Sequence, residues 1–143
     1  MELSGISKIL GGEKILHKRI KNRLDLIELG KKGITKDAFS HLAKYLCFSM
    51  TQMAELLPVT ERTVQRYGPK DHFNRVVSEQ ILHIAEVAAK GVEVFEDKEK
   101  FLSWISHPNT GLANRTPISL LNSRFGTEMV IDELGRIEHG VFS

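Results

Sequence analysis

The segment "TERTVQRY", residues 60–67, carries side chains that could bond directly to DNA. Arg62 and Arg66 can each pair with guanine through two hydrogen bonds, and Gln65 can pair in the same way with adenine. Thr63 can contact a phosphate or a thymine methyl group. These residue types predict nucleic-acid recognition, on the condition that a helix holds them away from the core.

Two short helices should position these side chains. Ser49 followed three residues later by Gln52 is a capping box, which predicts a helix from Ser49 to Leu57. Pro58 cannot continue that helix, and Thr60 offers a second N-cap. Ala54 is small enough for the two helices to cross closely, and Leu57, Val59 and Val64 are apolar residues that can wedge them at a steep angle. The segment therefore predicts a helix-turn-helix at about residues 49–67, whose second helix would enter the major groove.

A corner between two helices of an all-helical core is the alternative interpretation of this segment. Pro58 also departs from the usual helix-turn-helix, in which a glycine commonly relieves the turn. The exposed residues after Glu61 favour DNA, because several can bond to it and none is acidic. The candidate DNA-binding residues are Ser49, Gln52, Thr60, Arg62, Thr63, Gln65 and Arg66.

Charge is divided unevenly along the 143 residues. Residues 1–45 hold ten Lys/Arg against five Asp/Glu, whereas residues 93–143 hold five against eight. This polarity fits a front part that meets a polyanion and a back part that meets a different partner. The alternative is a solvated basic face on a single helix around "KILHKRIKNR", residues 14–23.

The sequence contains few residue patterns that are typical of catalytic or metal-binding sites. The six histidines have no metal-ligand spacing, and no glycine-rich phosphate loop occurs between a strand and a helix. Glu128 and Asp132 would share a helix face, but no substrate pocket is evident near them. Cys47, the single cysteine, lies in an apolar run and is expected to be a buried structural thiol. We predict no catalytic residue, no metal site and no cofactor, and hence no enzyme.

The chain is expected to be cytoplasmic. Its start, "MELSGISKILGG", lacks a basic segment followed by a long apolar stretch. No run approaches the ~20 apolar residues that cross a bilayer. The composition, with 41% hydrophobic and 27% charged residues, is that of an ordinary globular protein of one or two domains.

Helical periodicity dominates the front of the chain. Apolar positions Leu16, Ile20, Leu24 and Ile27 predict one helical face, and Gly33 should break it. Thr35 can cap a second helix, whose apolar face would hold Phe39, Leu42, Ala43 and Leu46. A third stripe contains Phe73, Val76, Val77, Ile81, Ile84, Ala85 and Ala88, and should end at Lys90 and Gly91. "GVEVF", residues 91–95, is the one segment that could instead be a strand.

A seam is expected near residues 91–97, which divides the chain into regions 1–92 and 93–143. Asp97 can cap "KEKFLSWIS", and Pro108 should stop that helix. Thr116 and Pro117 predict the start of another helix, with Thr116 accepting free backbone N–H groups and Gly126 as its end. Thr127 can then cap a last helix that runs toward Val141.

The back half resembles the C-terminal domain of the Xre/MbcA/ParS-type antitoxins, the toxin-binding domain of two-component toxin–antitoxin modules. The helix-turn-helix upstream fits the same family, so the resemblance covers roughly residues 35–143. The matching positions are Phe101, Trp104, Pro108, Asn109, Leu112, Thr116, Pro117, Leu120, Leu121, Gly126 and the segment "LGRIEHG" at 134–140.

This resemblance implies an all-α protein, with a helix-turn-helix DNA-binding domain followed by a small helical toxin-binding domain. It implies a dimeric antitoxin that autoregulates its operon and neutralises a cognate toxin, commonly a RES-domain enzyme that depletes NAD⁺. The alternative is a helix-turn-helix regulator whose C-terminal domain only oligomerises or senses a ligand. Spacing alone favours Trp104 as a core residue.

The stretch "LGRIEHGVFS" suggests how a toxin could be bound. Val141 and Phe142 would expose apolar surface unless they dock, either on the protein's own core or in a partner's cleft. We expect them to be buried anchors at the entrance of the toxin's active site, with Arg136 and Glu138 making polar contacts. The candidate toxin-binding residues are Arg124, Arg136, Glu138, Val141, Phe142 and Ser143.

Overall fold

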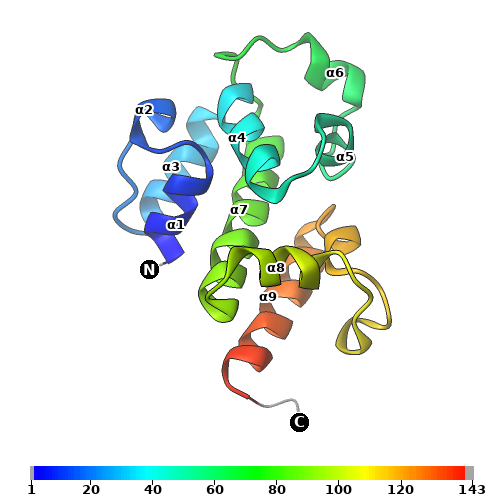
Figure 1. The fold of residues 1–143 in the computed structure, drawn as a ribbon. Helices are drawn as coiled ribbons and strands as arrows, with labels where there is room; N and C mark the ends of the chain where they lie inside the picture. Colours follow the sequence, from blue (N-terminus) through cyan, green and yellow to red (C-terminus); the bar gives the residue numbers. More distant parts are fainter. Residues whose placement is uncertain (1, 141–143) are drawn as a thin grey trace.

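The computed structural model describes residues 2–140, and these residues form helices and turns without a β-strand (Figure 1). The all-α prediction is therefore confirmed. None of the described helices is long and apolar enough to cross a membrane. The helices are α1 (Glu2–Ile9), α2 (Glu13–Leu16), α3 (Arg23–Lys32), α4 (Lys36–Leu46), α5 (Met50–Ala54), α6 (Glu61–Arg66), α7 (Arg75–Phe95), α8 (Lys98–Ile105) and α9 (Arg124–Glu138), with short 3₁₀ helices η1 (Thr110–Leu112) and η2 (Pro117–Leu120).

Helix α7 is the central element, and α1, α3, α8 and α9 all pack against it. Asn74 caps its start through a hydrogen bond from Val77 N–H to the Asn74 side chain. The predicted apolar stripe is buried except at Val76, which is 66% exposed, so that assignment was wrong. Because Val76 directly precedes Val77, which points into the core, it lies on the outer side of the first turn.

The predicted end of this helix at Lys90 and Gly91 is also wrong, since α7 continues to Phe95 and ends at the left-handed residue Glu96. "GVEVF" is accordingly helical. Gly91 serves close packing: a Cβ added there would lie 2.1 Å from the ring of Phe101 on α8. The boundary at residues 92–93 falls inside α7, and the division into two regions there stays a prediction.

The basic stretch 14–27 is two helices rather than the single predicted one. Helix α2 ends at Leu16, and His17 turns the chain in the left-handed conformation with φ 54°. Asn22 and Asp25 then form a capping box that starts α3, a local signal that outweighs the apolar spacing. Leu16 and Ile20 are buried, but Leu24 is 68% exposed and Ile27 is also exposed.

The next helix follows the prediction. Thr35 caps α4 by accepting a hydrogen bond from Ala38 N–H, and the four predicted apolar residues are buried. Gly33 ends α3 at φ 98°, where a Cβ would lie 2.4 Å from the carbonyl oxygen of Phe73. Cys47 is exposed, not buried as predicted, because it occupies the left-handed turn that ends α4.

In the back half, Asp97 caps α8 as predicted, although the helix stops at Ile105, before Pro108. Pro117 begins the 3₁₀ helix η2, and Thr116 makes no side-chain cap there, contrary to expectation.

Two assignments around α9 were wrong. Gly126 lies inside this helix, and Ser123, not Thr127, is its N-cap. The Thr127 side chain is buried and donates to the carbonyl of Arg124. A Cβ at Gly126 would lie 1.7 Å from the carbonyl oxygen of Leu120, so this glycine permits α9 to touch η2.

Candidate functional site

The predicted helix-turn-helix is formed by α5 and α6, at the upper right of Figure 1. The Ser49 N–H donates to Gln52 Oε1 at 2.9 Å, and the Gln52 N–H donates to Ser49 Oγ at 3.1 Å, which confirms the capping box. The helix ends at Ala54 rather than at the predicted Leu57. Leu56 and Leu57 are nevertheless buried, so the turn before Pro58 is fixed by the core.

Helix α6 presents three of the predicted DNA-contacting side chains to solvent. Val64 is buried and anchors the helix, whereas Arg62, Gln65 and Arg66 are exposed. Thr60 caps the helix through the Thr63 N–H at 3.1 Å. The helix therefore offers two guanidinium groups and one amide on a surface that residues 2–140 leave open.

Thr63 differs from these three residues. Its side chain is half-buried, and its hydroxyl lies 2.9 Å from the Thr60 hydroxyl. Ser49, Gln52 and Thr60 are exposed residues whose side chains already cap α5 and α6. These four residues build the helix ends, while Arg62, Gln65 and Arg66 remain the outward-facing set.

The two helices are held together by Glu61. Its carboxylate accepts a hydrogen bond from the Thr51 hydroxyl on α5 and a longer one, 3.4 Å, from the Gln65 amide. This acidic residue therefore links α5 and α6 at the surface. It also orients Gln65 on the surface of α6.

The C-terminal end of α6 is held by a lysine that sequence reasoning missed. Lys36, at the start of α4, donates its ammonium group to the Tyr67 carbonyl at 2.9 Å and to the Gln65 carbonyl at 3.5 Å. Tyr67 in turn stacks on Phe73, with ring centroids 4.7 Å apart. No local sequence signal marks this interaction, because it joins residues about thirty positions apart.

Helix α9 carries the predicted toxin-binding residues that the structure describes, and each is ion-paired. Arg124 pairs with Glu128 at 3.2 Å on an exposed turn, and Arg136 pairs with the nearly buried Glu133. Glu138 pairs with Lys90 of α7 at 2.6 Å, and this hydrogen bond lowers the pKa of the Glu138 carboxyl. Arg124 and Glu138 lie at opposite ends of α9, so they do not form one compact site.

The remaining candidates, Val141, Phe142 and Ser143, lie outside the described residues. Trp104 is half-buried on α8, where its ring packs against Phe95 and Phe101 with centroid distances of 5.7 and 6.5 Å. Trp104 was predicted to be a core residue, and it packs at the edge of the core with part of its side chain exposed.

A groove between α3, α7 and α9 was not anticipated. It has a volume of about 310 Å³, and Arg23, His83 and Glu86 lie in it. The pKa of Glu86 is lowered by the His83 ring, 3.9 Å from its carboxylate, and by the Arg23 guanidinium, which donates a hydrogen bond to it at 3.0 Å. Phe125, which follows the groove residue Arg124 in α9, is 82% exposed. Among residues 2–140, no three His, Cys, Asp or Glu side chains gather as a metal site would require.

Two known domains match this chain in order. Residues 25–86 match the antitoxin Xre-like helix-turn-helix domain, and residues 90–140 match the antitoxin Xre/MbcA/ParS C-terminal toxin-binding domain. The first match contains α5 and α6, and the second contains α8 and α9.

Two relatives and one solved structure agree with these matches. An "Antitoxin Xre" of Yersinia enterocolitica is 32% identical over 120 residues, which span 82% of this chain and 81% of the relative. An "Antitoxin Xre" of Photorhabdus laumondii is 35% identical over 80 residues, 55% of this chain and 54% of the relative. A chain in the crystal structure of the M. tuberculosis MbcT-MbcA toxin-antitoxin complex has the same fold, with a TM-score of 0.57 at 18% identity, covering 76% of this chain and 96% of that chain.

Proposed function

Because the chain belongs to the Xre antitoxin family and is thus an antitoxin of a toxin–antitoxin system, we propose that it neutralises a cognate toxin by direct binding and represses its own operon. The observation that carries this proposal is the presence of both domains in one chain, a helix-turn-helix at 25–86 and a toxin-binding domain at 90–140. The protein acts as a binding partner of the toxin and of operator DNA, with no catalytic step of its own. Toxin binding and operator binding both take place in the cytoplasm.

The cognate toxin is a RES-domain enzyme that depletes NAD⁺, in line with the resemblance of the back half. Residues 93–143 carry an excess of acidic groups, which complements the basic pocket of an enzyme that binds a phosphate-rich dinucleotide. The C-terminal end of α9 carries Arg136 and Glu138, and Val141, Phe142 and Ser143 follow it in sequence. These residues contact the toxin, with Val141 and Phe142 as apolar anchors at its active-site entrance and Arg124 as an outlying contact.

The DNA partner is an operator with two-fold symmetry. A homodimer places two copies of α6 in successive major grooves, about 34–36 Å apart, because the symmetry of the protein is mirrored in the operator. Arg62, Gln65 and Arg66 supply base or phosphate contacts, since their side chains are exposed and α6 is fixed at both ends.

Replacing Arg62 or Arg66 by alanine should weaken operator binding. For an arginine that binds a base, the substitution should cost about 1–3 kcal/mol and relax specificity at one position; for an arginine that binds a phosphate, it should lower the salt slope by about one unit. Gel-shift titrations at several salt concentrations measure both quantities. Arg115→Ala, an exposed arginine in the back half, is the control. Unchanged binding in both α6 variants would show that α6 does not face DNA.

Co-expression with the neighbouring reading frame tests the antitoxin assignment. The neighbour alone should arrest growth, and the pair should grow normally and copurify as a complex. Arrest that persists in the pair, without any complex, would contradict the assignment. That result would leave the alternative of a regulator whose C-terminal domain only oligomerises or senses a ligand.

A further inference from the structure

A depression of about 430 Å³ lies between α2 and the loop that follows α6, and four of its eight lining residues have nitrogen-bearing side chains. Lys14 and His17 approach from α2 and its end, and Lys70 and His72 approach from the loop that follows α6. Neither Lys14 nor Lys70 has a carboxylate within salt-bridge distance among the described residues. The depression therefore offers two ammonium groups and two imidazole rings to an anion.

The floor of the same depression is apolar, formed in part by Ile15 and Pro69. Its one acidic member, Asp37, lies 3.6 Å from His41 on the next turn of α4. A DNA strand alternates anionic phosphates with less polar deoxyribose rings. The depression has an apolar floor and a cationic rim, so it can contact both the deoxyribose rings and the phosphates of a DNA strand. A small free anion would contact the cationic rim alone.

The loop that forms one wall is fixed relative to α6. The Asp37 N–H donates to the Pro69 carbonyl at 2.9 Å, and the Lys36 N–H donates to the Asp71 carbonyl at 3.1 Å. The Asp71 carboxylate accepts a hydrogen bond from the Gly68 N–H at 2.7 Å. Since Lys36 also donates to the Tyr67 carbonyl at the end of α6, this residue links the wall of the depression to that helix.

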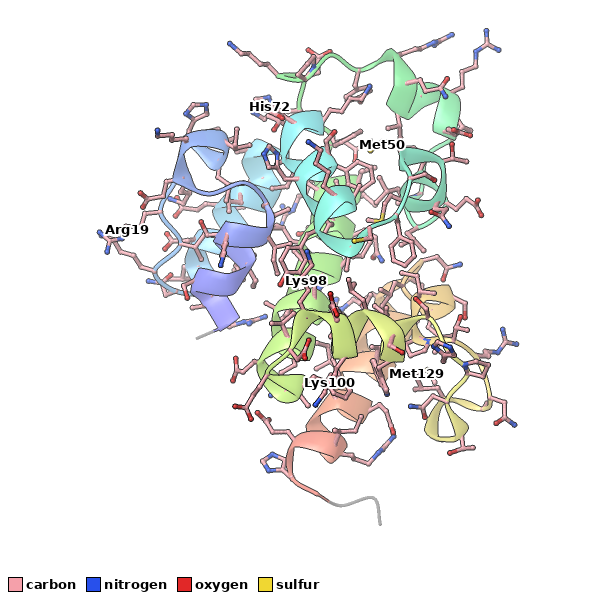
Figure 2. The ribbon with its side chains drawn as sticks, in the orientation of Figure 1. Arg19, Met50, His72, Lys98, Lys100 and Met129 are labelled. Atoms are coloured by element: carbon pink, nitrogen blue, oxygen red, sulfur yellow. The ribbon has the colours of Figure 1, made fainter. Side chains whose placement is uncertain are left out.

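We propose that this depression binds the sugar-phosphate backbone of the DNA strand that borders the major groove occupied by α6. Lys70 follows Arg66, the last residue of α6, by four residues, a span of at most about 14 Å, so it can reach the backbone that flanks the groove. Figure 1 shows this loop running from α6 along the upper edge of the molecule, and Figure 2 places His72 on that edge. The inference rests on the DNA-binding part of the proposed function.

The double variant Lys14→Ala/Lys70→Ala tests this assignment. It should bind more weakly to a duplex from the promoter of the chain's own gene and to an unrelated duplex of equal length. The ratio of the two affinities should be unchanged, because phosphate contacts carry no sequence information. The slope of log K against log salt should fall by nearly two units, about 0.9 for each phosphate that the variant no longer neutralises. Lys100→Ala, an exposed lysine on α8 well below this edge in Figure 2, should match wild type.

The outcomes separate the two proposals. Wild-type protein that binds neither duplex would reject both the DNA-binding function and the backbone contact. Wild-type binding together with a double variant of unchanged affinity and salt slope would overturn the backbone contact alone. Loss of preference for the promoter duplex, with unrelated DNA bound as before, would assign these lysines to base contacts and also overturn it. Thermal unfolding of the double variant and of Lys100→Ala measures whether each protein is still folded.

Discussion

Deleting residues 140–143 should abolish neutralisation of the cognate toxin and leave folding and DNA binding nearly intact. Helix α9 already ends at Glu138, and the buried residues nearest that end are Leu134 and Glu133, so the deletion removes no buried residue of the described chain. Central anchor residues often carry about 2 kcal/mol or more each, and removing two of them would weaken toxin binding roughly a thousandfold.

Growth rescue and titration of the purified toxin measure this effect. Val141→Ala and Phe142→Ala should each give an intermediate loss, and Arg115→Ala, an exposed change in the same half, should behave as wild type. A truncated chain that still protects cells and still inhibits the toxin would exclude occlusion by these residues. Inhibition would then come from another surface, such as the helices that carry Trp104 or Arg124.

Gly126→Ala should destabilise the protein strongly. The added Cβ would lie 1.7 Å from the Leu120 carbonyl oxygen, a backbone atom that cannot move without separating η2 from α9. Overpacking of this kind costs about 1–3 kcal/mol and occasionally more. For a chain of this size, each kcal/mol lowers the melting temperature by about 2–4 °C. Urea unfolding and thermal melts provide the free energy of unfolding and the melting temperature.

The same helix supplies a matched control. Gly135 has no atom within 4 Å of an added Cβ, so Gly135→Ala should stabilise α9 by about 0.5–1 kcal/mol through the higher helix propensity of alanine. Opposite signs for the two substitutions would support the tight contact of α9 with η2. Equal stability of Gly126→Ala and wild type would refute it.

The helix-turn-helix could be predicted from the sequence because its signals are local. Ser49 with Gln52, and Thr60 with the N–H of Thr63, are interactions within three residues, and the structure contains both. The apolar spacing of α4 likewise predicted its buried face. Where an N-cap signal and the spacing of apolar residues indicate the same helix, the local sequence is sufficient to predict that helix.

Some errors fall where packing between separate helices decides the outcome, and another comes from a local signal that was missed. Glycine often marks the end of a helix, yet Gly91 and Gly126 both lie inside helices. The ring of Phe101 and the carbonyl group of Leu120 occupy the space that a Cβ at these two positions would need. The predicted helix over the basic stretch 14–27 ignored the capping box of Asn22 with Asp25, which starts α3 partway through that stretch. Periodicity alone cannot distinguish a continuous helix from two helices in register.

The candidate site was predictable only in part. The side chains of α6 could be named from sequence, but Lys36, which holds its end, and the depression formed by α2 with the loop after α6 join segments far apart in the chain. The candidate toxin-binding residues were chosen from the family resemblance and from the apolar character of Val141 and Phe142. Their roles stay predictions.

The most direct test of the central claim is the rate of NAD⁺ consumption by the purified product of the neighbouring reading frame, measured while this protein is added. We expect the rate to fall in proportion to the antitoxin added and to reach its minimum at a fixed molar ratio, with the complex recovered by gel filtration. An active toxin whose rate stays unchanged in an excess of this protein would contradict neutralisation by direct binding.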